Sequence, residues 1–202
     1  MIPIIEKSRL YAEKIAIIDP AGTYSYAILL EQALCIAGAI VKKTSGTPGP
    51  VLFLVPSGFT YIAVQWGIWL SGNIAVPVHA AHPAEEIAYL MGDTGTQLLI
   101  FDETLEDKAK AAAPEPPICI SLSQLLREPT GSLPEVNMDD DALMIYTSGT
   151  TGKPKGVVMS HRQLDTQMRS LSEAWAWRRD DRILNVLPMH HVHGVVNISC
   201  CA

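Results

Sequence analysis

One short stretch of this 202-residue sequence concentrates side chains that could hold an anion. The ten residues from Thr147 to Gly156, TSGTTGKPKG, contain four hydroxyl side chains, three glycines and two lysines, but no carboxylate and no large apolar group. Glycines let a polyanion approach the backbone N–H groups, hydroxyls donate further hydrogen bonds, and Lys153 and Lys155 add positive charge. These residue types therefore predict a loop that binds a phosphate-bearing ligand.

The stretch differs from the P-loop of nucleotide-binding proteins, whose pattern is GxxxxGK[ST]. Pro154 follows the lysine, and Thr147 stands where the first glycine is required. The apolar run GVVMS (156–160) predicts a strand, whereas a P-loop opens a helix whose N-terminus faces the phosphate. We therefore expect a loop between two strands. The competing interpretation is a solvated hairpin tip with incidental lysines.

A second cluster of reactive side chains, LPMHHVHG, places His190, His191 and His193 within four residues. In an extended chain His191 and His193 would share a face, which suggests a metal site. Because no third or fourth ligand of matching character lies nearby in the sequence, we predict no metal site there. Partly buried or solvated imidazoles are the expected outcome.

Short apolar runs alternate with helical stretches along the chain, which is typical of an α/β fold with a mostly parallel sheet flanked by helices. Strands are expected at 14–19 (with a short partner within 20–26), 51–55, 74–78, 97–101, 117–121, 141–146 and 156–160. Helices are expected at 26–41, 60–70, from Pro83 to Gly92 or Gly95, at 103–113, and from 161 after a capping box formed by Ser160 and Gln163. The Pro-rich, acidic segment 127–141 is expected to be a connector, either an internal domain boundary or a long loop inside one domain.

The composition limits the partners and the compartment. A net charge of −6 and a pI near 5.4 argue against nucleic acid or an anionic membrane as the main partner. The most apolar window (59–78) is interrupted by polar residues, glycines and Pro77, so we expect no stable membrane insertion. The four cysteines fit neither a metal nor a disulfide pattern, and the start of the chain resembles no targeting signal. A cytoplasmic location is expected, with the mitochondrial matrix as the alternative.

The order YTSGTTGKPKG closely resembles the phosphate-binding loop of the adenylate-forming (AMP-binding) superfamily, which includes acyl-CoA synthetases, luciferases and peptide-synthetase adenylation domains. The resemblance implies a loop that closes over the β- and γ-phosphates of ATP while a carboxylate attacks the α-phosphate. It assigns to ATP phosphate binding the residues Thr147, Ser148, Gly149, Thr150, Thr151, Gly152, Lys153, Pro154 and Lys155.

A second motif of the same family, Pro-x-x-His-x-x-Gly, follows the phosphate loop, and Pro188, His191 and Gly194 occupy its places here. The resemblance implies that His191 lies beside the acyl group and the passage through which the thiol arrives. Its implied role is orientation or gating rather than proton abstraction.

Almost the whole chain shares this likeness, and segments such as YIAVQWGIWLSGNIAVPV and HHVHGVVN are similar to the malonyl-CoA synthetase branch of the acyl-CoA synthetases. The implied reaction joins ATP and a small carboxylic acid into an acyl-adenylate and pyrophosphate, while Mg²⁺ and cations neutralise the phosphate charge. Coenzyme A then displaces AMP to give the thioester. Two alternatives are a medium- or long-chain acyl-CoA synthetase and a non-catalytic nucleotide-binding fragment that needs a partner chain.

Members of this family are longer, and three of their later elements are not found in this sequence. These are an acidic Mg²⁺ ligand in a Tyr-Gly-x-Thr-Glu segment, a ribose-binding aspartate and a lysine in a mobile C-terminal domain. We therefore expect residues 1–202 to form an incomplete N-terminal AMP-binding domain, without its C-terminal half and without the small C-terminal domain. Such a chain should be inactive alone, should expose strand edges and apolar faces, and could work with a complementary chain that carries the other motifs.

Overall fold

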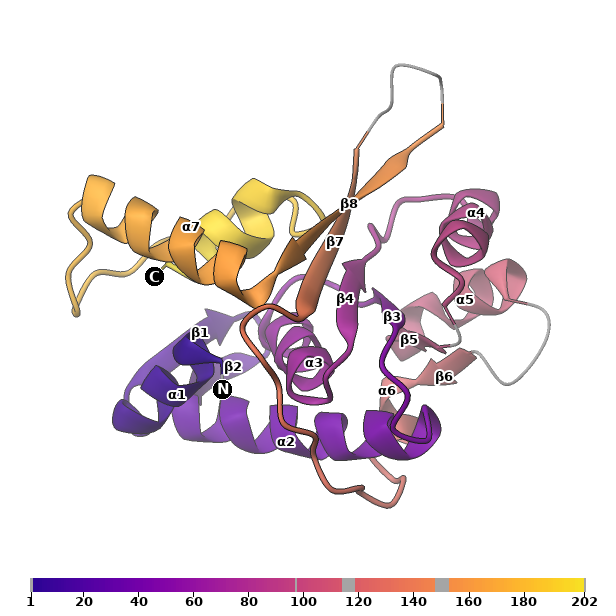
Figure 1. Ribbon diagram of the computed structural model, residues 1–202, viewed down its shortest axis with the longest axis horizontal. Coiled ribbons are helices and arrows are strands. Elements are labelled where there is room, and N and C mark those ends of the chain that lie inside the picture. The colour runs from indigo at the N-terminus through magenta and orange to yellow at the C-terminus, as the bar shows by residue number, and fades with distance from the viewer. Residues whose placement is uncertain (1, 97, 114–118, 148–152, 202) are drawn as a thin grey trace.

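The computed structural model describes residues 2–96, 98–113, 119–147 and 153–201 as an α/β fold (Figure 1). Its middle layer is a six-stranded sheet with the order β6-β5-β3-β4-β7-β8. The strands are β3 (Pro50–Leu54), β4 (Ile74–Pro77), β5 (Leu98–Phe101), β6 (Cys119–Ser121), β7 (Asp141–Thr147) and β8 (Lys155–Ser160). A separate antiparallel pair consists of β1 (Ile15–Asp19) and β2 (Gly22–Ser25). The predicted fold class is confirmed.

Most neighbouring strands of the large sheet run parallel. β3 pairs with β4 and β5, β4 pairs with β7, and β5 pairs with β6 in this way. Among the described strands of this sheet only β8, which lies at its edge, is antiparallel to its neighbour β7. The short connection between β7 and β8 explains this direction, because a parallel return needs a crossover of about a dozen residues or more.

Successive residues of the central strands enter two different cores, because side chains alternate across a sheet. Val51 and Phe53 of β3 join the core that also contains residues of α2 (Tyr26–Lys43) and α3 (Phe59–Leu70). Leu52 and Leu54 join the core formed with α4 (Ala84–Thr94) and α5 (Glu106–Ala112). The helices therefore cover both faces of the sheet (Figure 1), as expected for a continuous apolar run in a parallel strand.

The remaining helical elements are α1 (Pro3–Leu10), α6 (Leu122–Leu125), α7 (His161–Ala174), a 3-10 turn η1 (Glu103–Leu105) and a π-helical turn η2 (His193–Ile198). The predicted long helices α2, α3, α4 and α7 are confirmed. Gly95 ends α4 with a φ of 64°, so it is Gly95 and not Gly92 that acts as the stop. α1, α6 and η2 were not expected, because they contain only eight, four and six residues and show too little periodicity.

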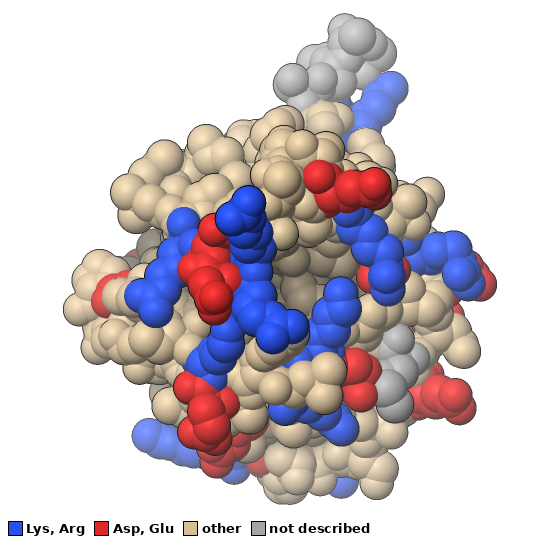
Figure 2. Space-filling view, turned by 90° about the vertical axis from the view of Figure 1, so that its left-hand side faces the viewer, with Lys and Arg blue, Asp and Glu red and all other residues tan. Residues whose placement is uncertain are grey.

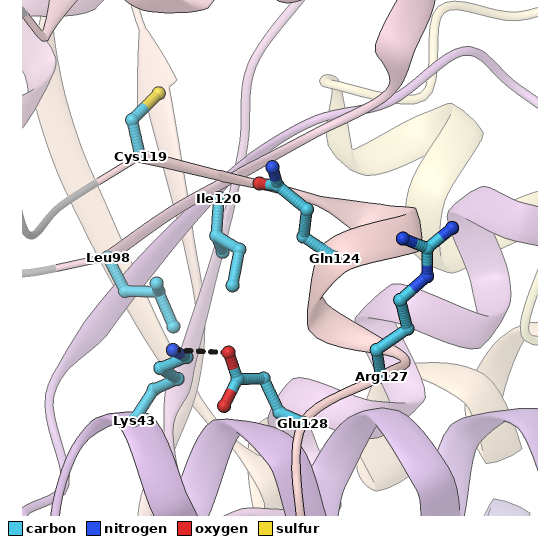
Figure 3. Close-up of a pocket in the computed structure, with 7 residues that line it drawn as sticks. All are labelled: Lys43, Leu98, Cys119, Ile120, Gln124, Arg127 and Glu128. Carbon is cyan, nitrogen blue, oxygen red and sulfur yellow. Dashed lines mark ion pairs between the residues drawn. The ribbon is translucent and has the colours of Figure 1, made fainter.

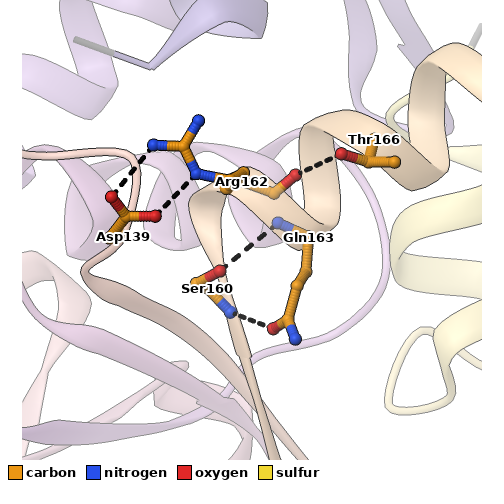
Figure 4. Close-up of polar contacts among 5 residues, drawn as sticks. All are labelled: Asp139, Ser160, Arg162, Gln163 and Thr166. Carbon is orange, nitrogen blue, oxygen red and sulfur yellow. Dashed lines mark hydrogen bonds and ion pairs between the residues drawn. The ribbon is translucent and has the colours of Figure 1, made fainter.

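Figure 4 shows why α7 begins at His161. Ser160 Oγ accepts the Gln163 N–H at 3.3 Å, and Gln163 Oε1 accepts the Ser160 N–H at 2.8 Å. These two bonds form the predicted capping box. Arg162 donates to both carboxylate oxygens of Asp139, at 2.6 and 2.9 Å, so the segment before β7 is tied to the first turn of α7.

The connector at 127–140 contains no helix or strand and packs against the helices of the first core. The Gly131 N–H donates to the Gly38 carbonyl of α2 at 2.8 Å. Just after the connector, Trp69 Nε1 of α3 donates to the Ala142 carbonyl at 2.8 Å.

The helix α3, which lies in the most apolar window of the sequence, has only 12 residues. In the described part of the chain no helix combines the length and the apolar character needed to cross a bilayer.

Candidate functional site at the carboxyl edge of the sheet

The predicted loop and the predicted histidine segment lie at the same edge of the sheet. β3, β4, β5 and β7 are mutually parallel, so their carboxyl ends meet there. β4 leads into His79 and β7 ends at Thr147, while the His190 ring lies against His79 with a centroid distance of 4.2 Å. Ligand sites of open parallel α/β sheets form outside the carboxyl ends of the strands. This edge is therefore the expected place for a site.

The base of the predicted phosphate loop is a regular antiparallel strand pair. Tyr146 pairs with Gly156 and Thr147 pairs with Lys155, whose carbonyl accepts the Thr147 hydroxyl at 3.5 Å. A Cβ at Gly156 would lie 2.8 Å from Met144 Sδ, so glycine permits the close contact between the two strands. The far ends of β7 and β8 rise above the body of the molecule (Figure 1).

Helix α4 supports this base from the side. Tyr89 Oη donates to the Pro154 carbonyl at 3.0 Å, and the Tyr89 ring centroid lies 5.6 Å from Lys153 Nζ. Tyr146 Oη donates to Asp93 Oδ2 at 2.6 Å. Burial, and then the hydrogen bond and charge of Asp93, raise the pKa of Tyr146 well above its usual 10.0. Tyr146 therefore stays a donor, and α4 anchors both strands of the hairpin.

The described residues of the loop offer donors to a ligand. Thr147, Lys153 and Lys155 are exposed, and one hydroxyl with two ammonium groups suits phosphate oxygens. Away from the loop, basic and acidic side chains are interspersed, as Figure 2 shows for one face. The positive charge of Lys153 and Lys155 is therefore a local feature. Pro154 also belongs to the described part of the loop. The other predicted phosphate-binding residues lie outside the described residues: Ser148, Gly149, Thr150, Thr151 and Gly152.

The predicted Pro-x-x-His-x-x-Gly segment folds into a compact turn beside α3. Tyr61 Oη donates to the Met189 carbonyl at 2.5 Å, and the His191 N–H donates to the Pro188 carbonyl at 3.2 Å. A Cβ at Gly194 would lie 2.4 Å from the Pro188 oxygen, so this closure requires glycine. The structure thus brings the three motif residues together and leaves His191 exposed.

Two further histidines pack against this turn, and sequence reasoning missed them. One potential ligand nitrogen from each of His79, His82 and His190 lies within 4.8 Å of the others. The sequence places no further ligand beside the histidine segment, but the fold brings His79 and His82 against it. The extended stretch that would align His191 with His193 is also absent there, because the π-helical turn η2 begins at His193. The only signal in the sequence was the HAAH spacing of His79 and His82 after an apolar run. This spacing does not reveal which segment of the chain packs against the two histidines.

Burial favours the neutral form of His82 and His190. Desolvation lowers the pKa of His190 to about 4, and the neighbouring imidazoles act in the same direction. Desolvation also lowers the pKa of His82, while the Glu86 carboxylate, 3.9 Å from His82 Nδ1, acts in the opposite direction. These two rings therefore present lone pairs at neutral pH.

A cavity of about 480 Å³ lies at the opposite edge of the sheet (Figure 3). Lys43 and Glu128 form an ion pair of 2.6 Å at its wall. Leu98 and Cys119, the first residues of β5 and β6, also line it. Because the cavity lies at the amino ends of the parallel strands, it is not where such sheets place their ligands.

Comparisons with known proteins connect this chain with one enzyme family. A family model described as "AMP-binding enzyme" matches residues 5–202. The chain is 35% identical to "Malonate–CoA ligase ACSF3, mitochondrial" of Xenopus laevis over 100% of this chain, and 34% identical to the Homo sapiens protein of that name over 98%. It is 32% identical to "Malonate–CoA ligase" of Arabidopsis thaliana over 92% of its length. The chain spans 37%, 37% and 35% of these three relatives.

Solved structures share the fold. ATP-bound MatB from Rhodopseudomonas palustris matches with a TM-score of 0.83 and 22% identity, covering 98% of this chain and 42% of that one. The crystal structure of VinN matches with a TM-score of 0.86 and 23% identity, covering 98% of this chain and 53% of that one. At these identities the likeness shows the fold alone, and it agrees with the predicted mostly parallel sheet flanked by helices.

Proposed function

The chain belongs to the AMP-binding enzyme family, and on that premise we propose that it supplies the ATP phosphate loop of a carboxylate–CoA ligase. The observation that carries the proposal is the anchored base of the β7–β8 hairpin, which holds Lys153 and Lys155 at the carboxyl edge of the sheet. The loop assignment extends to the residues from Ser148 to Gly152.

In the proposed first half-reaction, ATP and a carboxylate give an acyl-adenylate and pyrophosphate. Negative charge accumulates on the departing β- and γ-phosphates, so two ammonium groups beside them stabilise the transition state. Thr147 adds a hydroxyl donor at the end of β7. Because Tyr89 and Asp93 of α4 hold the hairpin base, these donors need little reorganisation when ATP binds.

Mg²⁺ is proposed to accompany ATP as its usual counterion. A hard cation of this kind takes oxygen ligands such as carboxylates, waters and phosphates. The described side chains of the loop, Thr147, Lys153 and Lys155, are instead donors that suit phosphate. We therefore assign no residue of this chain to Mg²⁺.

For the second half-reaction, we propose that His191 orients the acyl group or gates the coenzyme A thiol. His191 is exposed at the carboxyl edge, and its ring centroid lies 4.0 Å from that of His190. The turn closed by Gly194 fixes its backbone. A side chain in this place can contact a substrate that approaches the end of β4.

Malonate is the proposed acid, because three relatives that match more than nine-tenths of this chain carry malonate–CoA ligase names. The alternative is a medium- or long-chain acyl-CoA synthetase. An arginine that pairs with the second carboxylate of malonate would separate the two, and we expect it outside residues 1–202. The proposed compartment is the cytoplasm, with the mitochondrial matrix as the alternative.

We further propose that residues 1–202 form an incomplete N-terminal domain, with the connector 127–140 as a loop inside it, and that this chain alone does not complete the reaction. The chain matches little more than a third of its malonate–CoA ligase relatives. In each relative the matching segment is part of one longer chain, which does not favour a separate complementary chain.

The loop assignment is tested by calorimetric titration of the purified chain with Mg-ATP. Replacing both lysines (Lys153→Ala with Lys155→Ala) should weaken binding by about tenfold or more, because two charge-assisted contacts to phosphate are lost. The matched control, Lys7→Ala with Lys42→Ala, removes the same charge from exposed positions of α1 and α2 and should leave affinity unchanged. Equal ATP affinity in the wild type and the loop variant would contradict the assignment.

A second assay addresses completeness. Malonate-dependent pyrophosphate release by the wild-type chain should stay at background, with or without coenzyme A. Robust turnover by these 202 residues would overturn the proposed incompleteness while leaving the loop assignment intact.

A further inference from the structure

The histidine cluster at the carboxyl edge has no role in the proposed ligase chemistry. We propose that His79, His82 and His190 form a binding site for a divalent transition-metal ion of the zinc type. The three residues come from two segments, the stretch after β4 and the turn before η2, and each offers one ring nitrogen within 4.8 Å of the other two. Three histidine nitrogens with an open fourth position are a known zinc ligand set.

The nitrogen separations are close to those that a metal ion requires. With Zn–N bonds of about 2.0–2.1 Å, tetrahedral ligands lie roughly 3.4 Å apart. The cluster therefore has to contract by about an ångström, which half-buried side chains achieve by small rotations about χ1 and χ2.

Two ring nitrogens of the cluster are buried without a hydrogen-bond partner. His82 Nδ1 and His190 Nδ1 both have this property in the described part of the chain. A buried polar atom without a partner is unfavourable by roughly 1–3 kcal/mol, and an unfilled ion site is one of its ordinary explanations. A metal ion between the rings would satisfy such lone pairs directly.

His79 supplies a reporter for ion binding. Its Nδ1 accepts the Ala81 N–H at 3.2 Å in an exposed hydrogen bond. Coordination through Nδ1 displaces this donor, and coordination through Nε2 moves the ring proton to Nδ1, which then cannot accept. Either way the Ala81 amide loses its partner when the metal binds.

The surroundings fit a borderline-soft dication better than Mg²⁺. Imidazole ligands favour zinc, copper and nickel, whereas Mg²⁺ and Ca²⁺ take oxygen. The Glu86 carboxylate lies 3.9 Å from His82 Nδ1, so it can offset charge or take the fourth position. Lys108 Nζ donates to the nearby Ala80 carbonyl. Its positive charge partly repels a bound cation, which should limit the affinity of the site for metal.

An ion in this place would fasten the segment after β4 to the turn that carries His191. His190 and His191 are neighbours in the chain with a ring centroid distance of 4.0 Å, so ordering one restrains the other. The site is separate from the phosphate loop, and its test does not depend on ligase activity.

The test uses tag-free, chelator-treated chain titrated with Co²⁺ and then with Zn²⁺. We expect one ion per chain, with the visible absorption of four-coordinate Co²⁺ that Zn²⁺ then displaces. Single variants His79→Gln, His82→Gln and His190→Gln should each weaken binding by at least about tenfold, since even loss of an outer-shell partner lowers metal affinity about 10–100-fold. His193→Gln is the matched control, because His193 is exposed and outside the cluster.

A second readout protects the test against misfolded variants. Zn²⁺ should raise the Tm of the wild type and of His193→Gln but not that of the cluster variants, and it should shift the Ala81 amide resonance. The absence of stoichiometric binding to the wild type would overturn the proposal. An equal loss of binding in His193→Gln would also overturn it, because it would mean that scattered imidazoles hold the ion.

Discussion

The buried ring of His161 contributes to the pH dependence of the stability of this fold. His161 is 3% exposed at the first position of α7, and its ring meets that of Trp69 edge-on at a centroid distance of 5.8 Å. Desolvation lowers its pKa from 6.5 to about 4, and the charge of Asp140 only partly opposes this. In the folded protein the ring is therefore neutral at neutral pH.

We predict that this ring makes the protein less stable as the pH falls from 6.5 towards about 4. Between these pH values the ring is protonated in the unfolded chain but not in the folded chain. The stabilisation that the neutral ring contributes is therefore fully present above pH 6.5 and is lost as the pH falls below it. The contribution to the slope is at most about 1.4 kcal/mol per pH unit. His161→Phe keeps an aromatic contact with Trp69 and should flatten the profile in urea unfolding experiments. An unchanged slope would show that the ring is not protonated on unfolding.

At this scale the sequence indicates candidate sites that are contiguous in the chain and misses those assembled from distant segments. Lys153 and Lys155 could be proposed as phosphate contacts because they lie in one contiguous stretch. The contact between His79 and His190 could not, because it joins the end of β4 to a turn beyond α7, and spacing within either segment does not show that they meet. Tyr89 was missed for the same reason, since its bond to Pro154 links α4 with the hairpin.

Among the elements, α2 and α3 pack so closely that a glycine is required between them. A Cβ at Gly67 of α3 would lie 2.5 Å from Ile36 Cγ2 and 3.1 Å from the Ala33 carbonyl oxygen. We predict that Gly67→Ala lowers the free energy of unfolding by about 1–3 kcal/mol through overpacking. Chemical denaturation of the wild type and the variant would measure this decrease in the free energy of unfolding.

Gly92 gives the matched control within α4. A Cβ there would meet nothing within 4 Å, so Gly92→Ala should stabilise the protein by roughly 0.5–1 kcal/mol through helix propensity. If both substitutions had the same sign, the close contact between α2 and α3 would be in doubt.

The capping box of α7 provides the next prediction. Ser160→Ala removes the acceptor for the Gln163 N–H and should destabilise the protein by about 1 kcal/mol. Ser170→Ala, at an exposed interior position of the same helix, should be neutral or slightly stabilising. Thermal unfolding of both variants separates loss of the cap from loss of a hydroxyl. A Ser160→Ala variant as stable as Ser170→Ala would argue against the cap.

Elements with strong local signals could be predicted from the sequence. The capping box fixed the start of α7, and the apolar runs fixed β3 and β7. The spatial order of the strands depends on pairing between distant segments, which no local pattern encodes.

At the scale of the whole molecule, the segment before the histidine turn carries two highly exposed apolar side chains. Leu184 and Val186, before the histidine turn, are 83% and 77% exposed, and Val157 of the edge strand β8 is 49% exposed. Exposed apolar groups and an open strand edge favour association between chains.

We therefore predict that Leu184→Ser combined with Val186→Ser reduces self-association, measured by light scattering over a concentration series. The free energy of unfolding should change little, because both side chains are already exposed. Leu10→Ser is the control, since Leu10 is 79% exposed but lies on α1. A decrease in association by Leu10→Ser alone would show that general hydrophobicity, and not this region, is responsible.

The central claim is that nucleotide phosphates bind at the carboxyl edge of the sheet, against the β7–β8 hairpin. The most direct measurement is amide NMR of the isotope-labelled chain during addition of Mg-ATP. The account predicts shifts at Thr147, Lys153 and Lys155 and at Tyr89 beneath them, with the cavity around Lys43 and Glu128 unchanged. Shifts confined to that cavity, with the hairpin silent, would contradict it.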